Sequence, residues 1–220
     1  MKFVYLLASI AMFIKILIIP NPALELEELS IVDLIVEDSG IPNAVSGIIF
    51  RNRLFDTIFE VIVFTIATLG IGYLMANEQP VASVYQFSDQ TSIVLARLGA
   101  TITAIICIEL AIRGHLSPGG GFAAGVAGGT AIGLIAITSS TEWMQKIYKK
   151  YHASIVEKVS VIIFMILAVV SLAGLELTHG NYGGLISGGW IPVLNILVAL
   201  KVALGSWAVV LVFIRYRGLL

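Results

Sequence analysis

A lysine inside an apolar run is the residue in this sequence best suited to chemistry within a membrane. Lys201 stands in IPVLNILVALKVALGSWAVVLVF, about 18 Å along a helix expected to begin near Gly189, from a rise of ~1.5 Å per residue. At that depth, near a membrane midplane, the side chain is too deep for easy snorkelling. Lys201 therefore either pairs with a carboxylate from another helix or titrates, because burial lowers the pKa of a lysine until it can pass a proton.

The stretch RNRLFDTIFE, residues 51–60, holds a second set of ionisable side chains. Arg53, Asp56 and Glu60 are three and four positions apart, so they share one helical face, which Thr68 extends. Asp56, near the expected interface, is either part of an ion path or a solvated carboxylate paired with Arg53. Glu60 lies about a turn deeper, where ionisable groups are costly and usually mark an ion or proton path. We therefore place Glu60 and Asp56 on a candidate path.

A third set lies around residue 110. Glu109 and Arg113 are four apart and are expected to form an ion pair. His115 follows at the helix end, and its ordinary pKa near neutrality suits a proton carrier, although an interfacial, hydrogen-bonded role is the alternative. Glu109 and His115 join the candidate path. By contrast, Glu157 and Lys158 open a later helix at its basic end and are expected to be interface anchors.

A glycine-rich motif separates two of the expected helices. Proline suits a helix start, and the glycines after it let backbones approach closely or expose amide groups. Beyond the motif, glycines recur every four residues from 121 to 133 and form a smooth ridge, typical of helix packing in membranes. The motif is therefore either a constriction in the path or simply a tight hairpin with a packing seam. Its core residues are Pro118, Gly119, Gly120, Gly121 and Phe122.

No catalytic, cofactor or metal motif accompanies these residues. The sequence has no HExxH, Walker loop or GxSxG, and no paired histidines suited to haem. The single Cys107, inside an apolar run, excludes a disulfide framework and a thiolate metal site. We therefore expect no metal, no cofactor and no enzymatic activity in this chain, and any redox chemistry in a partner.

Composition shows which elements must position these side chains. Of 220 residues, 58% are hydrophobic and 12% are charged, about half the charged fraction of a soluble domain, so the solvent must be largely lipid. The net charge of −1 excludes nucleic-acid binding. We expect an all-α, polytopic membrane protein of about six transmembrane helices, each of around 20 apolar residues. The candidate spans are about 3–20, 54–76, 92–114, 119–139, 155–177 and 189–214.

A polar linker at 77–91 divides a two-helix part, 1–76, from a four-helix part, 92–220. Lysines are retained on the cytoplasmic side of a membrane, and Lys146, Lys149 and Lys150 gather in the loop after the fourth span. The long first loop is instead acidic. Both termini are therefore expected to be cytoplasmic.

The segment from Gly114 to Phe122, with the glycine-rich helix after it and the lysine of the last helix, resembles the B subunit of Mrp-type sodium/proton antiporters over roughly residues 90–220. The stretch from Asn43 to Met75 resembles the C-terminal end of the large A subunit of these antiporters, and also the small E subunit of archaeal membrane-bound hydrogenases. Phe59 departs from the pattern, because glycine is expected there in the antiporters.

The resemblance implies a cofactor-free membrane subunit that assembles with other membrane subunits in a prokaryotic cell membrane, surrounded by lipid, and helps to form a path for Na⁺ or H⁺. The two parts are usually separate chains or lie in different subunits, so their fusion here is a departure. It leaves three hypotheses open. One is an antiporter subunit, the second is the same module in a hydrogenase-like or sulfane-reductase-like pumping complex, and the third is a structural adaptor.

Overall fold

The computed structural model describes residue 14 and residues 30–81, 83–84 and 86–218, and the regular structure among them is entirely helical. The chain divides into two units, residues 1–30 and 31–220, and the helix bundle lies within the second. The expected first span, 3–20, lies outside the described residues apart from Ile14.

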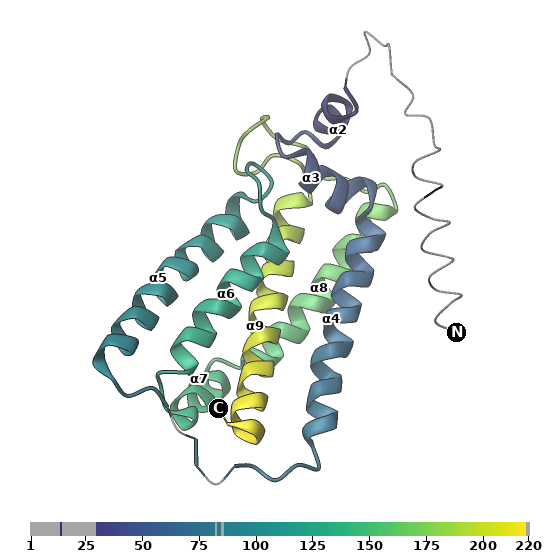
Figure 1. Ribbon diagram of the computed structural model, residues 1–220. Coiled ribbons are helices and arrows are strands. Elements are labelled where there is room, and N and C mark those ends of the chain that lie inside the picture. The colour runs from purple at the N-terminus through teal and green to yellow at the C-terminus, as the bar shows by residue number, and fades with distance from the viewer. Residues whose placement is uncertain (1–13, 15–29, 82, 85, 219–220) are drawn as a thin grey trace. The chain divides into compact units, whose positions relative to one another are not determined.

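Among the described residues, four helices are long and apolar enough to cross a membrane, and a fifth, apolar helix is shorter (Figure 1). The all-α, polytopic membrane class is therefore confirmed. The short helix corresponds to the expected span 119–139, but it has only 16 residues. The long helices are α4 (Leu54–Met75), α5 (Gln90–Arg113), α8 (Ala153–Leu172) and α9 (Ile191–Arg217), and the short one is α6 (Gly121–Ala136).

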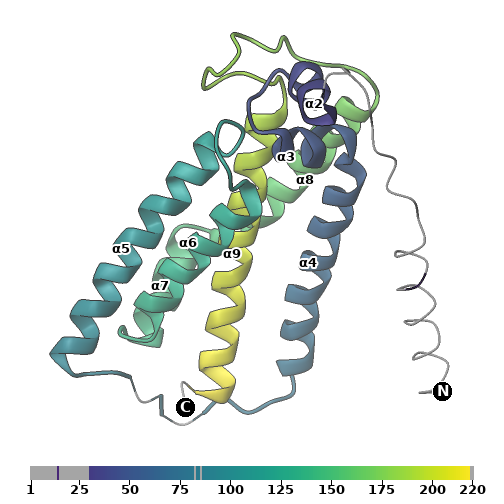
Figure 2. The ribbon, with the colours of Figure 1, turned by 45° about the horizontal axis from the view of Figure 1, so that its top comes forward.

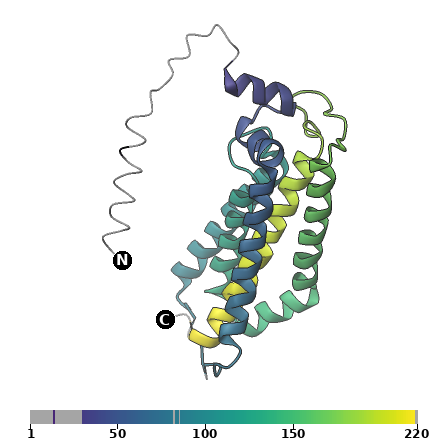
Figure 3. The same cartoon turned by 90° about the vertical axis from the view of Figure 1, so that its right-hand side faces the viewer.

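The last helix forms the centre of the bundle. α9 contacts α4, α5, α6 and α8, and it is the most buried of the long helices (Figure 3). Its residues Leu194, Val198 and Val202 are almost wholly buried against Phe164 of α8 and Leu54 of α4. Because lipid tails are as apolar as these side chains, close packing rather than expulsion of water must hold the helices together.

The segment before α4 is helical and folds over one end of the bundle. It comprises α2 (Ile31–Ser39), α3 (Ala44–Gly47) and a π-helical turn (Ile48–Asn52) that leads directly into α4. The Asn43 side chain caps α3 by accepting hydrogen bonds from the amides of Val45 and Ser46. We call this the α3 end of the bundle (Figure 2).

The opposite end carries a helix where the sequence indicated a basic loop. α7 (Thr141–Lys150) begins at a cap in which Ser140 Oγ accepts a 3.2 Å hydrogen bond from the amide of Trp143. Its ten residues are too few to cross a membrane. α7 packs against α8 and α9, and we call this the α7 end of the bundle. α8 ends at Leu172 rather than near 177, because Gly174 has a left-handed backbone, φ 78°, that stops the helix.

Candidate functional site

The centre of the candidate site is a buried ion pair between two long helices. The Nζ of Lys201, on α9, donates a hydrogen bond to Oε1 of Glu157, on α8. Lys201 is 2% exposed and Glu157 is 8% exposed. The ring of Phe64, on α4, lies 5.3 Å from Nζ and covers the cation from the third helix. Three helices thus meet at one charged pair.

The local sequence explains how the pair is held. The buried residues of α8, among them Ala153, Ser160 and Phe164, recur at spacings of three and four, and Glu157 belongs to that stripe. On α9, one turn beyond Lys201, Gly205 leaves room for the other partners: a Cβ there would lie 2.6 Å from the Phe64 ring and 3.3 Å from Glu157 Oε1. The missing side chain therefore allows the carboxylate and the ring to reach the lysine together.

A cavity of about 650 Å³ opens onto the ion pair between α4, α8 and α9. Hydroxyl groups from three helices line it, on Thr65, Thr68, Ser154 and Tyr148. Burial raises the pKa of Tyr148, so its phenol stays protonated and can donate a hydrogen bond. These hydroxyls and the ion pair are the polar part of a lining that also includes Leu69, Val161 and Ile162, and they suit water or a small cation beside the pair.

A second cavity, of about 320 Å³, adjoins the first at the α7 end. The two share the lining residues Gly72, Tyr148, Ala208 and Val212. Its other lining residues include Lys149 and Arg215. On the far side of the ion pair, toward the α3 end, α9 presents the buried apolar residues of the core. The two adjoining cavities thus lie between the pair and the α7 end of the bundle.

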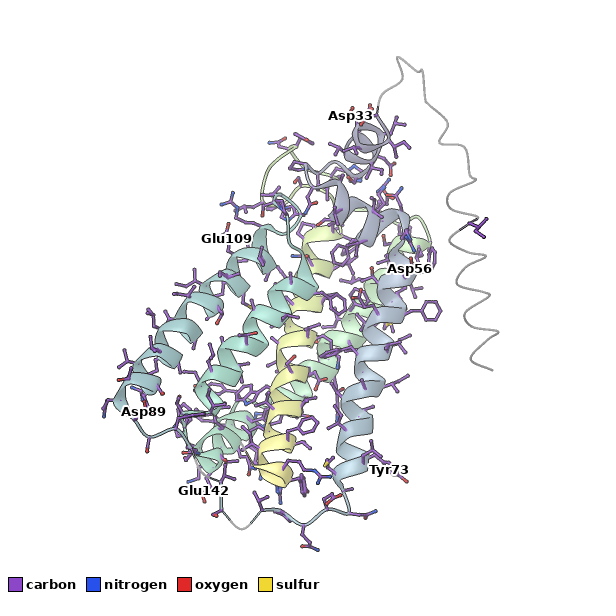
Figure 4. All side chains as sticks on the ribbon, in the orientation of Figure 1. Asp33, Asp56, Tyr73, Asp89, Glu109 and Glu142 are labelled. Carbon is purple, nitrogen blue, oxygen red and sulfur yellow. The ribbon has the colours of Figure 1, made fainter. Side chains whose placement is uncertain are left out.

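The structure separates Glu60 and Asp56 from this pair. Asp56 lies at the α3 end of α4 and forms an ion pair with Arg53 (Figure 4). Glu60 is exposed on the outer face of α4 and makes no ion pair with another described residue. Thr68, expected on the same stripe, instead lines the cavity.

The third predicted set also lies away from the pair. Glu109 and Arg113 form a 3.3 Å ion pair on the outside of α5, with side chains 54% and 52% exposed, at the same end as Asp56 (Figure 4). His115 is fully buried, with Nε2 3.4 Å from the carbonyl oxygen of Gly184 and no partner for Nδ1 among the described residues. Burial lowers the pKa of His115, so its neutral form is favoured.

The glycine-rich motif packs closely against α9. Gly119 and Gly120 have φ of 146° and 107°, which are not helical, so α6 begins at Gly121, two residues inside the expected span 119–139. A Cβ on Gly121 would lie 2.5 Å from the carbonyl oxygen of Asn195, so only glycine fits against α9 there. Phe122 packs at the edge of the hydrophobic core.

Side chains at and just before α3 hold the start of this motif by hydrogen bonds. The carbonyl oxygen of Gly114 accepts hydrogen bonds of 2.7 Å from Asn43 Nδ2 and from Ser46 Oγ. On the inner side, Asn195 Nδ2 donates to the carbonyl oxygens of Leu110 and Ala111 at the end of α5. The side-chain amides of Asn43 and Asn195 thus donate to backbone carbonyl groups that the end of a helix leaves without a partner.

Sequence reasoning missed Glu157, the partner of Lys201, because it lies close to a helix start and beside a lysine. Its position in the three-and-four stripe with Ser160 and Phe164 was the available signal. The described residues contain no group of three histidine, cysteine, aspartate or glutamate side chains that could hold a metal.

Comparison with known proteins identifies the family to which this chain belongs. A family model described as a domain related to the MnhB subunit of Na⁺/H⁺ antiporter matches residues 91–208, more than half of the chain. No curated protein sequence gives a significant match.

Two solved structures resemble the fold. One is a chain of the membrane-bound sulfane sulfur reductase, an archaeal respiratory membrane complex, with a TM-score of 0.67, 22% identity, and coverage of 97% of this chain and 98% of that chain. The other is a chain of the Mrp complex from Dietzia sp. DQ12-45-1b, with a TM-score of 0.64, 18% identity, and coverage of 98% of this chain and 26% of that chain. Both matches run through the two expected parts within a single chain.

Proposed function

Because this chain belongs to the family of domains related to the MnhB subunit of Na⁺/H⁺ antiporter, we propose that it is a membrane subunit of an Mrp-type antiporter module and contributes to its ion path. The observation that carries the proposal is the buried Glu157–Lys201 pair, which borders a cavity lined in part by hydroxyl groups. Charged groups at such depth are costly and are kept where they serve ion or proton movement.

The geometry suggests how exchange could be coupled at this pair. With its proton, Lys201 neutralises Glu157. A Na⁺ that enters the cavity and contacts the carboxylate repels the lysine ammonium, which gives its proton to water in the cavity and becomes a neutral amine. Departure of the Na⁺ reverses the step. One positive charge thus always faces Glu157, and the site avoids the cost of an unpaired buried charge.

Other parts of the proposed path lie outside this cavity. Glu60 and Glu109 are exposed on outer helix faces and Asp56 is half-buried at the α3 end, and we assign all three to the boundary with neighbouring membrane subunits. His115, buried at the α3 end, would serve as a relay or a packing residue in that half. A charged side chain facing lipid is costly, so a protein partner over Glu60 is the more stable arrangement.

The same module inside a respiratory complex is the second candidate function. The sulfane sulfur reductase match favours it, since that match covers nearly the whole length of both chains. In that setting the chain has no catalytic role of its own, and redox chemistry belongs to the partners. Hydrogenase-like or iron–sulfur subunits encoded beside this chain would favour the respiratory complex, and their absence a free antiporter.

Conservative replacement of the lysine tests the ion path. Arginine keeps the charge but does not deprotonate in a protein, so Lys201→Arg should abolish sodium-driven pH changes in vesicles while leaving the complex assembled on a native gel. Lys158→Arg, a change at a neighbouring residue lining the same cavity, is the matched control and should retain transport. Substantial transport by Lys201→Arg would show that Lys201 need not release its proton. The pair would then have only a structural role, as the adaptor hypothesis requires.

Orientation is tested separately. We propose that the α7 end and both termini face the cytoplasm of a prokaryotic cell, because α7 carries the lysines. In a Cys107→Ala background, Gln145→Cys should react with a membrane-impermeant thiol reagent only after lysis, and Ser30→Cys in intact cells. The reverse pattern would overturn the orientation.

A further inference from the structure

An apolar groove on the opposite side of the bundle has no part in the ion path. It has a volume of about 470 Å³ and lies between α5, α6 and α7. Its wall consists of alanine, isoleucine, methionine and tryptophan side chains, apart from Thr101. The Thr101 hydroxyl donates a 2.9 Å hydrogen bond to the carbonyl oxygen of Arg97 within its own helix. The groove therefore suits an apolar occupant of small cross-section.

The length of the groove is close to half the thickness of a membrane's hydrocarbon core. On α5 its lining extends from Ala100 to Ile108, and Arg97 continues the same helical face one turn nearer the α7 end. From Arg97 to Ile108 is about 16 Å at ~1.5 Å per residue. Half of a hydrocarbon core is about 15 Å. The groove, with Arg97, thus matches one acyl chain in length, and its lining on α5 lies around the middle of that helix.

Three cations and a tryptophan lie on the two helices that border the groove, α5 and α7. Trp143 lines it from α7, and Lys146 and Lys150 follow three and seven positions later, beside that tryptophan on the helix surface. Both lysines and Arg97 are exposed, and none has an acidic partner among the described residues. The acid Glu142 lies one turn before Lys146 on the same part of α7, and no ion pair joins the two.

Together these features identify the chemistry of the occupant. Tryptophan is enriched at the level of lipid headgroups, and lysine and arginine near the surface attract anionic lipids. We propose that the groove binds an anionic phospholipid, with an acyl chain between α5 and α6 and the phosphate between Arg97 and the lysines of α7. This site is independent of the Glu157–Lys201 pair.

Native mass spectrometry of the full chain, purified with the subunits that accompany it, tests the site with two lipids. Phosphatidylglycerol should bind at least about 10-fold more tightly than phosphatidylcholine, since three cations face its phosphate. The triple change Arg97→Gln, Lys146→Gln, Lys150→Gln should remove that preference. Lys149→Gln, which removes the same charge from the face of α7 that lines the second cavity rather than the groove, should leave it unchanged. Equal binding of both lipids, or equal loss with Lys149→Gln, would overturn the proposal.

Filling the groove tests the acyl chain. Ala104→Phe should weaken the binding of both lipids, whereas Ile102→Phe, on the exposed side of α5, should not. Loss of a subunit from Ala104→Phe with unchanged lipid binding would show that a partner helix occupies the groove and would refute the proposal.

A measurement on the unaltered protein avoids any folding defect. Phosphatidylglycerol with a photoreactive group at the end of its acyl chain should label the α5 peptide that contains Ile105 and Ile108. Labelling confined to α4 or α8 would contradict the site.

Discussion

The two sides of α9 are built on opposite principles. Toward α6, glycines bring the backbones so close that a Cβ on Gly121 or Gly129 would overlap Asn195 or Ser206. Toward α4 and α8, the ring of Phe64 and the Glu157–Lys201 pair keep the helices apart around a cavity of about 650 Å³. A single helix thus has one face for close packing and another that leaves room for polar groups.

The difference teaches how a small membrane subunit can hold a charged site. The glycine seam needs no polar groups, because packing supplies its stability. The charged side requires full pairing, because removing either partner leaves a buried charge uncompensated. A rigid seam on one side therefore supports a costly site on the other.

The largest contrast should appear in access to water. In a Cys107→Ala background, Thr68→Cys in the cavity should react rapidly with a small water-soluble thiol reagent, because the thiolate that reacts needs water. Ala104→Cys in the apolar groove should be almost inert. Reaction rates measured by mass spectrometry decide this, and similar rates at the two positions would erase the distinction between a polar and an apolar side.

The next effect concerns the ion pair. Glu157→Leu leaves Lys201 buried without its partner and should destabilise the protein by about 3–5 kcal/mol if the lysine stays charged. The double change Glu157→Leu, Lys201→Leu should recover most of that loss while transport remains absent. Unfolding by SDS in mixed micelles measures both, and a double variant no more stable than the single one would argue against the pair.

A smaller effect is expected at the glycine seam. Gly121→Ala forces its Cβ against the Asn195 carbonyl and should cost about 1–3 kcal/mol. Gly133→Ala is the matched control: nothing lies within 4 Å of a Cβ there, and alanine favours helix, so stability should be unchanged or slightly increased. The same unfolding measurement applies, and equal losses at both positions would contradict a seam confined to the α9 side.

The smallest effect belongs to the exposed pair on α5. Glu109→Gln should change the stability of the isolated chain by less than about 1 kcal/mol, because both side chains are half exposed. Arg113→Gln should behave alike. A loss comparable to that of Glu157→Leu would mean that this pair also holds the fold.

Much of the candidate site followed from single residues read in their local sequence. Lys201 was conspicuous because a lysine in a long apolar run has few explanations, and pairing with a carboxylate from another helix was one of the two. Glu157 could not be chosen as that carboxylate, since its neighbours at a helix start suggested an interface. Glu60 remained a candidate by depth alone, and depth does not say whether a side chain faces the bundle or its surroundings.

Hydropathy is a property of consecutive residues, so the sequence by itself determined the membrane class, the approximate spans and the presence of an ionisable residue deep within one. The start of α6 at Gly121 and the end of α8 at Leu172 depend on glycines in left-handed conformations, which the sequence permits but does not require. Only the tertiary structure decided which faces of the helices meet. The pairing of Glu157 with Lys201, 44 positions apart, depends on the rotation of α8 against α9, and that rotation is set by packing among several helices at once.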